Sequence, residues 1–242
     1  MWLLMDLVPY ITMIFIWQAI YRGAATIQDY SLIQVMQYYV MVAVIDRLTV
    51  VHFEGWRAEQ IRDGKIDFYL IRPFSYLLEI YTSSVASKFF AFLLFLPVLG
   101  LLVFIINFFI PGFSLPDFFA NAPQFLLVLF AAHLIQFIFG LWIVLLTFWL
   151  EGSNGLEHFK WVTVALFSGS IMPVIFLPEL MRNIVELLPF KYLFVVPVML
   201  LQGQYSLVPF DYLYMTGVIL GMLALTAFVW KKARLQYSSV GG

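Results

Sequence analysis

The chain alternates between long apolar runs and short polar breaks. Six runs are apolar enough to predict membrane-spanning helices, at residues 1–20, 32–51, 89–110, 122–150, 161–176 and 212–230. A helix rises 1.5 Å per residue, so about 20 apolar residues cross the roughly 30 Å of hydrocarbon in a bilayer. The pattern predicts a single all-α transmembrane domain over residues 1–242, a polytopic membrane protein with six transmembrane helices.

The segment 178–209 does not fit a simple span. It contains the charged residues Glu179, Arg182, Glu186 and Lys191, and its apolar run at 192–201 is too short to cross. Pro189 and Pro197 break it further. We expect a re-entrant or interfacial hairpin before helix six.

The long polar passage, residues 53–88, contains five basic and five acidic residues. Phe53, Trp56 and Ile61 recur at helical spacing, Gly64 is placed to end a helix, and residues 66–71 are expected to be semi-extended until Pro73. A balanced surface with interspersed apolar residues suits an element that docks on another protein. We therefore predict a short amphipathic helix that couples this chain to a partner.

The basic residues predict the orientation. Placing 53–88, the 151–160 turn and the C-terminal tail on one side gathers ten basic residues there and leaves three on the other. Basic residues near span ends favour the cytoplasm. Both termini are therefore predicted to be cytoplasmic and the hairpin extracytoplasmic.

Composition agrees with a membrane protein and limits the chemistry. The chain is 63% hydrophobic and 11% charged, and its formal net charge of -1 gives no reason to expect a nucleic-acid partner. It has no cysteine and three histidines on different segments. HExxH, GxSxG and the GxxxxGK[ST] phosphate loop are all absent. We expect no catalytic, metal or cofactor site, and no ATP hydrolysis by this chain.

Polar residues inside the spans have two interpretations each. His133 and Gln136 lie three apart on one helix face, which favours an interhelical hydrogen bond over a ligand or proton relay. Asp46 and Arg47 near the end of the second span favour side chains that reach the cytoplasmic interface over a buried functional charge.

The segment IRDGKIDFYLIRP, residues 61–73, resembles the cytoplasmic-loop signature of a bacterial family of type-2 ATP-binding-cassette (ABC) permeases. WQAIY at 17–21 and the tyrosines Tyr30, Tyr38 and Tyr39 are similar to the same family. The order of elements also agrees over nearly the whole chain.

The resemblance implies the permease subunit of an ABC exporter in the bacterial cytoplasmic (inner) membrane. ATP would be bound by a partner ATPase subunit, and a second permease chain, identical or different, would complete the path through the lipid. The ATPase would dock on the following residues: Phe53, Trp56, Arg62, Gly64, Asp67, Arg72 and Pro73. For Arg62, Asp67 and Arg72 the alternative is a solvated or headgroup-facing surface. The aromatic, charge-poor spans suggest an amphipathic or lipid-like substrate.

Two other functions remain open from the sequence. A secondary transporter without an ATPase would need polar groups at the membrane midplane, where the chain offers His133, Gln136 and the break at 168–173. A membrane-embedded lipid-modifying enzyme would need a carboxylate pair, such as Glu179 with Glu186, or Asp63 with Asp67.

Overall fold

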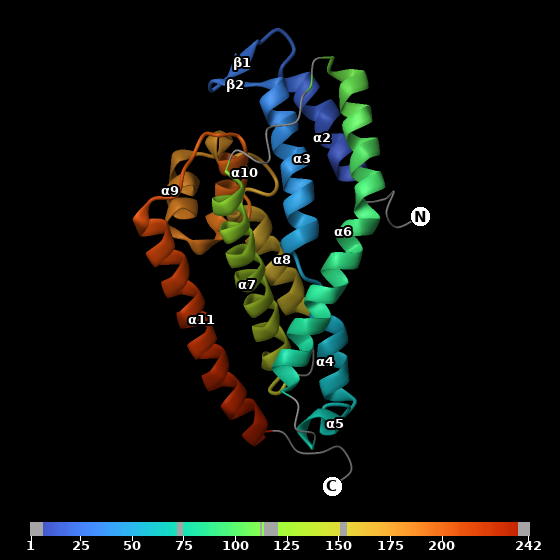
Figure 1. Ribbon diagram of the computed structural model, residues 1–242, viewed down its shortest axis with the longest axis vertical. Helices are drawn as coiled ribbons and strands as arrows, with labels where there is room; N and C mark the ends of the chain where they lie inside the picture. Colours follow the sequence, from blue (N-terminus) through green and yellow to red (C-terminus); the bar gives the residue numbers. More distant parts are fainter. Residues whose placement is uncertain (1–6, 72–74, 112, 114–120, 151–153, 237–242) are drawn as a thin grey trace.

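The protein is described by a computed structural model over residues 7–71, 75–111, 113, 121–150 and 154–236 (Figure 1). Its helices are α2 (Leu7–Ile20), α3 (Leu32–Thr49), α4 (Glu54–Arg62), α5 (Asp67–Leu70), α6 (Tyr76–Phe109), α7 (Ala122–Leu146), α8 (Asn154–Phe167), α9 (Glu179–Leu187), α10 (Val195–Leu201) and α11 (Pro209–Gln236). Single 3-10 turns cover Val174–Phe176 and Pro189–Tyr192, and β1 (Thr26–Ile27) pairs with β2 (Tyr30–Ser31). The prediction of an all-α polytopic membrane protein is confirmed.

Helices overlap every predicted span, although α8 ends at Phe167 within the span predicted at 161–176. Among the described residues, α6, α7 and α11 are each long and apolar enough to cross a membrane, and α9 with the segment up to Leu201 forms a bent fourth candidate. By contrast, α2 and α8 have 14 residues each, or about 21 Å. Six crossings therefore stay a prediction.

Helix starts follow local capping chemistry. Ser31 and Gln34 form a capping box at the start of α3, where the Gln34 backbone N–H donates to the Ser31 hydroxyl and the Ser31 N–H donates to Gln34 Oε1. The Ser75 hydroxyl accepts from the Leu78 N–H and caps α6. Because α6 begins at Tyr76, the polar residues up to Lys88 continue the third span as helix.

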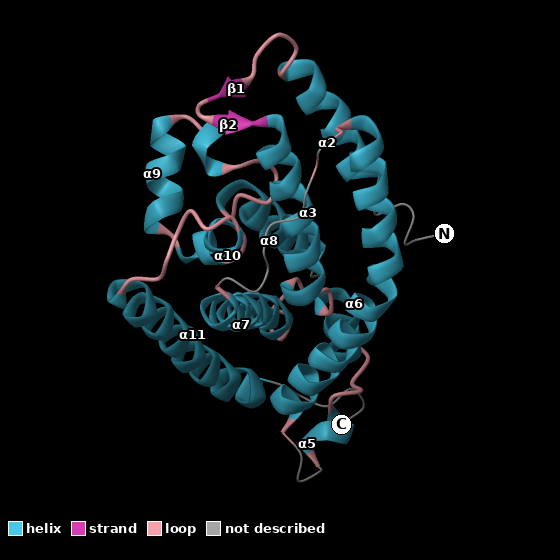
Figure 2. Cartoon of the chain, turned by 45° about the horizontal axis from the view of Figure 1, so that its top comes forward, coloured by secondary structure: helices cyan, strands magenta, loops and turns pink. Residues whose placement is uncertain are grey.

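The helix α7 is the centre of the molecule. In Figure 2 it is seen nearly end-on, with α3, α6, α8, α10 and α11 around it. The most apolar part of α7 is 67% buried, whereas that of α11 is 11% buried. Most apolar side chains of α6 and α11 are therefore exposed at the surface, where lipid or another protein can cover them.

The chain bends by 80° between α9 and the segment from Pro189 to Leu201. A bent pair of this kind is compatible with the predicted hairpin. Pro189 lies at the bend. Pro197 lies in the first turn of α10, where backbone N–H groups have no partner within the helix, so that proline costs no hydrogen bond there. Pro197 is therefore not a break, contrary to our expectation.

The two ends of α11 are anchored to different parts of the molecule. Near its start, the buried Asp211 carboxylate accepts hydrogen bonds from the hydroxyls of Tyr192 and Tyr205 at 2.6 and 2.7 Å. Removal from water and the bond to Asp211 raise the pKa of Tyr205 to about 12. Near its other end, Trp230 stacks on Tyr76 of α6 at 5.8 Å between ring centroids.

Candidate functional site

The predicted docking segment lies at the end of the molecule opposite the β1–β2 hairpin (Figure 1). The first helix in it, α4, is amphipathic in an unusual way. Four of its residues are buried, namely Glu54, Arg57, Ala58 and Ile61, and two of these are charged. Burying a charge is costly unless it is paired, so the inner face of α4 needs partners of opposite charge.

Glu54 finds its partner on α8. The Lys160 ammonium donates to Glu54 Oε1 and, at 3.2 Å, to the carbonyl of Val51. Both charged side chains are almost completely buried, with 8% of Lys160 and 6% of Glu54 exposed. The start of α4 is therefore fixed to α8 by an ion pair that solvent barely reaches.

Gly140 of α7 provides the space for this ion pair. A Cβ atom at Gly140 would overlap with Glu54 Oε1 and lie 3.2 Å from Lys160 Nζ. Only a residue without a side chain lets the α7 backbone approach the two charges so closely.

We expect Gly140→Ala to lower the free energy of unfolding by about 1–3 kcal/mol, because it overfills a packed site. Unfolding of the purified protein in mixed micelles measures this change. Gly100→Ala is the matched control, since nothing lies within 4 Å of a Cβ there; its greater helix propensity should stabilise the protein by up to about 1 kcal/mol. Equal behaviour of the two variants would contradict the packing role of Gly140.

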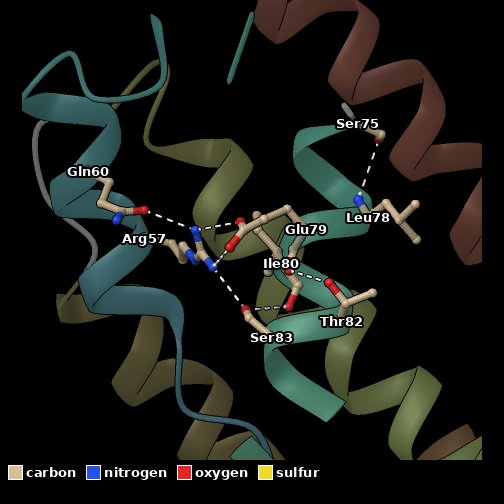
Figure 3. Close-up of polar contacts among 8 residues, drawn as sticks. All are labelled: Arg57, Gln60, Ser75, Leu78, Glu79, Ile80, Thr82 and Ser83. Atoms are coloured by element: carbon tan, nitrogen blue, oxygen red, sulfur yellow. Dashed lines mark hydrogen bonds and ion pairs between the residues drawn. The ribbon is translucent and has the colours of Figure 1, made fainter. Parts of the chain in front are cut away.

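Arg57 finds its partners on α6 (Figure 3). Its guanidinium donates to Glu79 Oε1 and the Ser83 hydroxyl at 2.8 and 2.9 Å, and Nη1 lies 2.8 Å from Glu79 Oε2. Nη1 also donates to Gln60 Oε1 at 3.1 Å. Arg57 is 1% exposed. A bidentate guanidinium–carboxylate pair fixes orientation as well as distance, so α4 is also fixed to α6.

An apolar cluster also attaches this segment to α6 and α7. Ile61 and Ile66 pack with Ile80 of α6 and with residues of α7. The Phe53 ring lies 5.3 Å from that of Phe137. The segment around α4 thus contacts α6, α7 and α8 at once.

The outer face of α4 is open. Trp56 is 57% exposed, with its ring under the Arg57 guanidinium at 4.3 Å. Arg62 is exposed and Asp67, at the start of α5, is half-buried. Phe53 is half-buried, and its ring packs on that of Phe137 in α7. Less of Phe53 than of Trp56 is therefore exposed on the outer face. Arg72 and Pro73 lie outside the described residues.

Gly64 ends α4 as predicted. It has φ +71°, the left-handed conformation that glycine adopts without strain. The Lys65 N–H donates to the Gln60 carbonyl and the Gly64 N–H to the Ile61 carbonyl, the two bonds of a Schellman motif. Beyond it, Asp67–Leu70 is the helix α5, so the expectation of a semi-extended segment was wrong. Burial of Ile66 in the apolar cluster favours this compact turn.

Sequence reasoning missed the inner-face charges Glu54 and Arg57 of α4 and their respective partners, Lys160 and Glu79. The spacing of Glu54, Arg57 and Ile61 would have placed these three residues on one helix face. A lysine directly before the apolar run that begins at Trp161 was a second signal. Neither pattern identifies which distant residue completes each pair.

Two open clefts of about 570 Å³ each adjoin the start of α4. One lies between α4, α7 and α8, the other between α2, α3 and α8, and His52 and Trp161 line both. Desolvation, followed by the nearby Lys88 ammonium, lowers the pKa of His52. Both clefts have a mixed lining of apolar, aromatic and charged side chains; the charged residues are Glu54, Glu157 and Lys160 in the first cleft and Asp46 and Arg47 in the second.

His133 and Gln136 behave as interhelical hydrogen-bond partners. His133 Nδ1 lies 3.3 Å from the Thr49 carbonyl and Gln136 Nε2 donates to the Thr49 hydroxyl at 3.2 Å. Both therefore attach α7 to the end of α3, as the favoured interpretation predicted. Within the described parts of the chain, no cluster of three or more histidine, aspartate or glutamate side chains could hold a metal ion.

The comparison with protein families gives one match. The family model described as ABC-2 family transporter protein covers residues 7–241. No curated protein and no solved structure matches the chain significantly. The family match extends over the predicted spans, the α4–α5 segment and the hairpin alike. The chain therefore belongs to the ABC-2 family of transporter proteins.

Proposed function

We propose that the chain is the permease subunit of an ABC exporter and that α4 couples it to a separate ATPase subunit. The main supporting observation is the attachment of α4 to two helices, α6 and α8, through an ion pair to each, in which the α4 charges are buried. Its outer face meanwhile presents Trp56 and Arg62. An exposed aromatic residue beside charged groups is typical of an interface hot spot.

This attachment would let α4 transmit a movement of the partner to α6 and α8. Closure of an ATP-bound partner against its outer face would push a helix that cannot slide relative to α6 or α8. The push would then move both helices as rigid bodies. Gly64 and the Schellman motif keep the exit of α4 in a fixed direction, so α5 extends the same surface.

We place the α4 end in the bacterial cytoplasm, with both termini on that side, on the strength of the ten-to-three distribution of basic residues. A second permease chain, identical or different, would cover apolar surface that one chain leaves exposed. The clefts beside α8 are the best candidates for the substrate path, and their combination of apolar and charged lining residues suits an amphipathic or lipid-like substrate.

Trp56→Ala should raise the Kd for the ATPase subunit about 30-fold, the effect of losing one interface hot spot. Arg62→Glu and Asp67→Arg should separate ATP hydrolysis from transport while the protein stays folded. Co-purification of the ATPase with the tagged chain measures the first effect, and transport per ATP hydrolysed in proteoliposomes measures the second.

Lys231→Glu is the matched control, because Lys231 is an exposed lysine near the same end of the molecule on α11. It should leave both measurements unchanged. Normal coupling in both Arg62→Glu and Asp67→Arg would overturn the docking site. Recovery of the chain alone, folded and active in gradient-driven uptake, would favour a secondary transporter.

A further inference from the structure

A third cavity, of about 250 Å³, lies between the start of α4 and the helix α6. One wall is polar and comes from α6, while the other holds an imidazole and an indole from the α4 side. The α6 wall consists of Ser83, Ser84, Ser87 and Lys88. The imidazole is that of His52 and the indole that of Trp56. A water occupies about 30 Å³ in the liquid, so the cavity has room for a phosphate group and its ester carbons.

Lys88 supplies the charge in this cavity. Among the described residues, it makes no hydrogen bond and no ion pair, and its side chain is half-buried. The charged groups that interact with it are Arg47 and Lys160 and the carboxylates of Asp46 and Glu54. Together with Lys88, this group contains three cations and two carboxylates. The surroundings are left with one positive charge, which suits a ligand with a single negative charge.

The position of Lys88 along α6 indicates where that ligand resides. The helix continues from Phe89 to Phe109, about 30 Å at 1.5 Å per residue and equal to the hydrocarbon thickness of a bilayer. Phe89 and Phe90 are 67% and 63% exposed directly after Lys88. Lys88 thus lies at the depth of the headgroups, with lipid-facing aromatic residues beginning beside it.

We propose that this cavity binds the phosphodiester of an anionic phospholipid, with Lys88 as its charged contact and the Ser84 hydroxyl as a hydrogen-bond donor, because the Ser83 and Ser87 hydroxyls already donate to carbonyls of α6. The acyl chains lie along the exposed apolar face of α6. Ser83 also accepts from Arg57, so the headgroup sits at the joint between α4 and α6 (Figure 3). The site does not depend on the proposed ATPase partner.

The test is native mass spectrometry of the delipidated full chain, titrated separately with phosphatidylglycerol and phosphatidylcholine of identical acyl chains. The first phosphatidylglycerol should bind about fivefold more tightly than the first phosphatidylcholine, the preference expected from one lysine near an anionic lipid. Lys88→Gln should abolish the preference and Lys88→Arg should retain most of it. Lys231→Gln removes an exposed lysine outside the cavity and should keep the full preference.

Three results would overturn the site. An unchanged preference in Lys88→Gln would show that Lys88 only extends into water. An equal loss in Lys88→Gln and Lys231→Gln would show attraction to overall charge. Displacement of the lipid by millimolar inorganic phosphate would identify the ligand as a free anion, whereas undiminished lipid binding would support a headgroup. Thermal unfolding of each variant establishes that it is folded before binding is compared.

Discussion

Replacing Lys160 with alanine should lower the free energy of unfolding by about 3–5 kcal/mol, the usual cost of leaving one charge of a buried pair alone. Glu54 would keep its carboxylate in a site that is almost closed to water. The Val51 carbonyl would also lose a donor. Unfolding in mixed micelles, followed by tryptophan fluorescence, measures the loss.

The double variant Glu54→Leu with Lys160→Met distinguishes charge from packing. It replaces both charges with apolar side chains of similar size, a change that is often neutral or stabilising for buried pairs. We expect it to recover most of the stability lost in Lys160→Ala. A double variant as unstable as the single one would show that the site depends on shape and not on the unpaired carboxylate.

Arg57→Met should cost about 2–3 kcal/mol, because charge-assisted hydrogen bonds to Glu79 and Ser83 are lost together. The cost is smaller than for Lys160, since Glu79 is 32% exposed and water can solvate its carboxylate. The same unfolding measurement applies. Under the proposed function, loosening of α4 should also reduce transport per ATP hydrolysed.

Arg62→Met is the matched control on the same helix. Arg62 is exposed, so its removal should change stability by less than about 0.5 kcal/mol. Under the proposed function it should nevertheless weaken ATPase binding. A stability loss as large as that of Arg57→Met would contradict the division of α4 into an inner, structural face and an outer, binding face.

Local signals in the sequence predicted the parts of the fold that depend on neighbouring residues. The apolar runs gave the helices, and Gly64 gave the end of α4, because hydropathy and a left-handed turn are local properties. The continuity of α6 from Tyr76 into the third span was missed because residues 82–88 are mostly polar. In the structure Thr82, Ser83 and Ser87 each donate to a carbonyl three residues earlier, so the helix continues.

The contacts of the buried charges on α4 could not be predicted in the same way. Lys160 and Glu54 are 106 residues apart, and either could have paired with other charges in the chain. The space for them comes from Gly140, a glycine within an apolar span with no local sign of its neighbours. Only the packing of α4, α7 and α8 brings the three together.

Because α11 is anchored at both ends, it connects the region of Tyr192 and Tyr205 with the start of α6. It is a continuous helix of 28 residues, about 42 Å long, with Asp211 bound to tyrosines of the hairpin region and Trp230 stacked on the start of α6. A helix of this kind acts as a strut, which resists compression along its axis. Under the proposed function, displacement of Tyr76 by α4 would therefore be transmitted along α11 to Tyr192 and Tyr205, even where the buried centre around α7 stays in place.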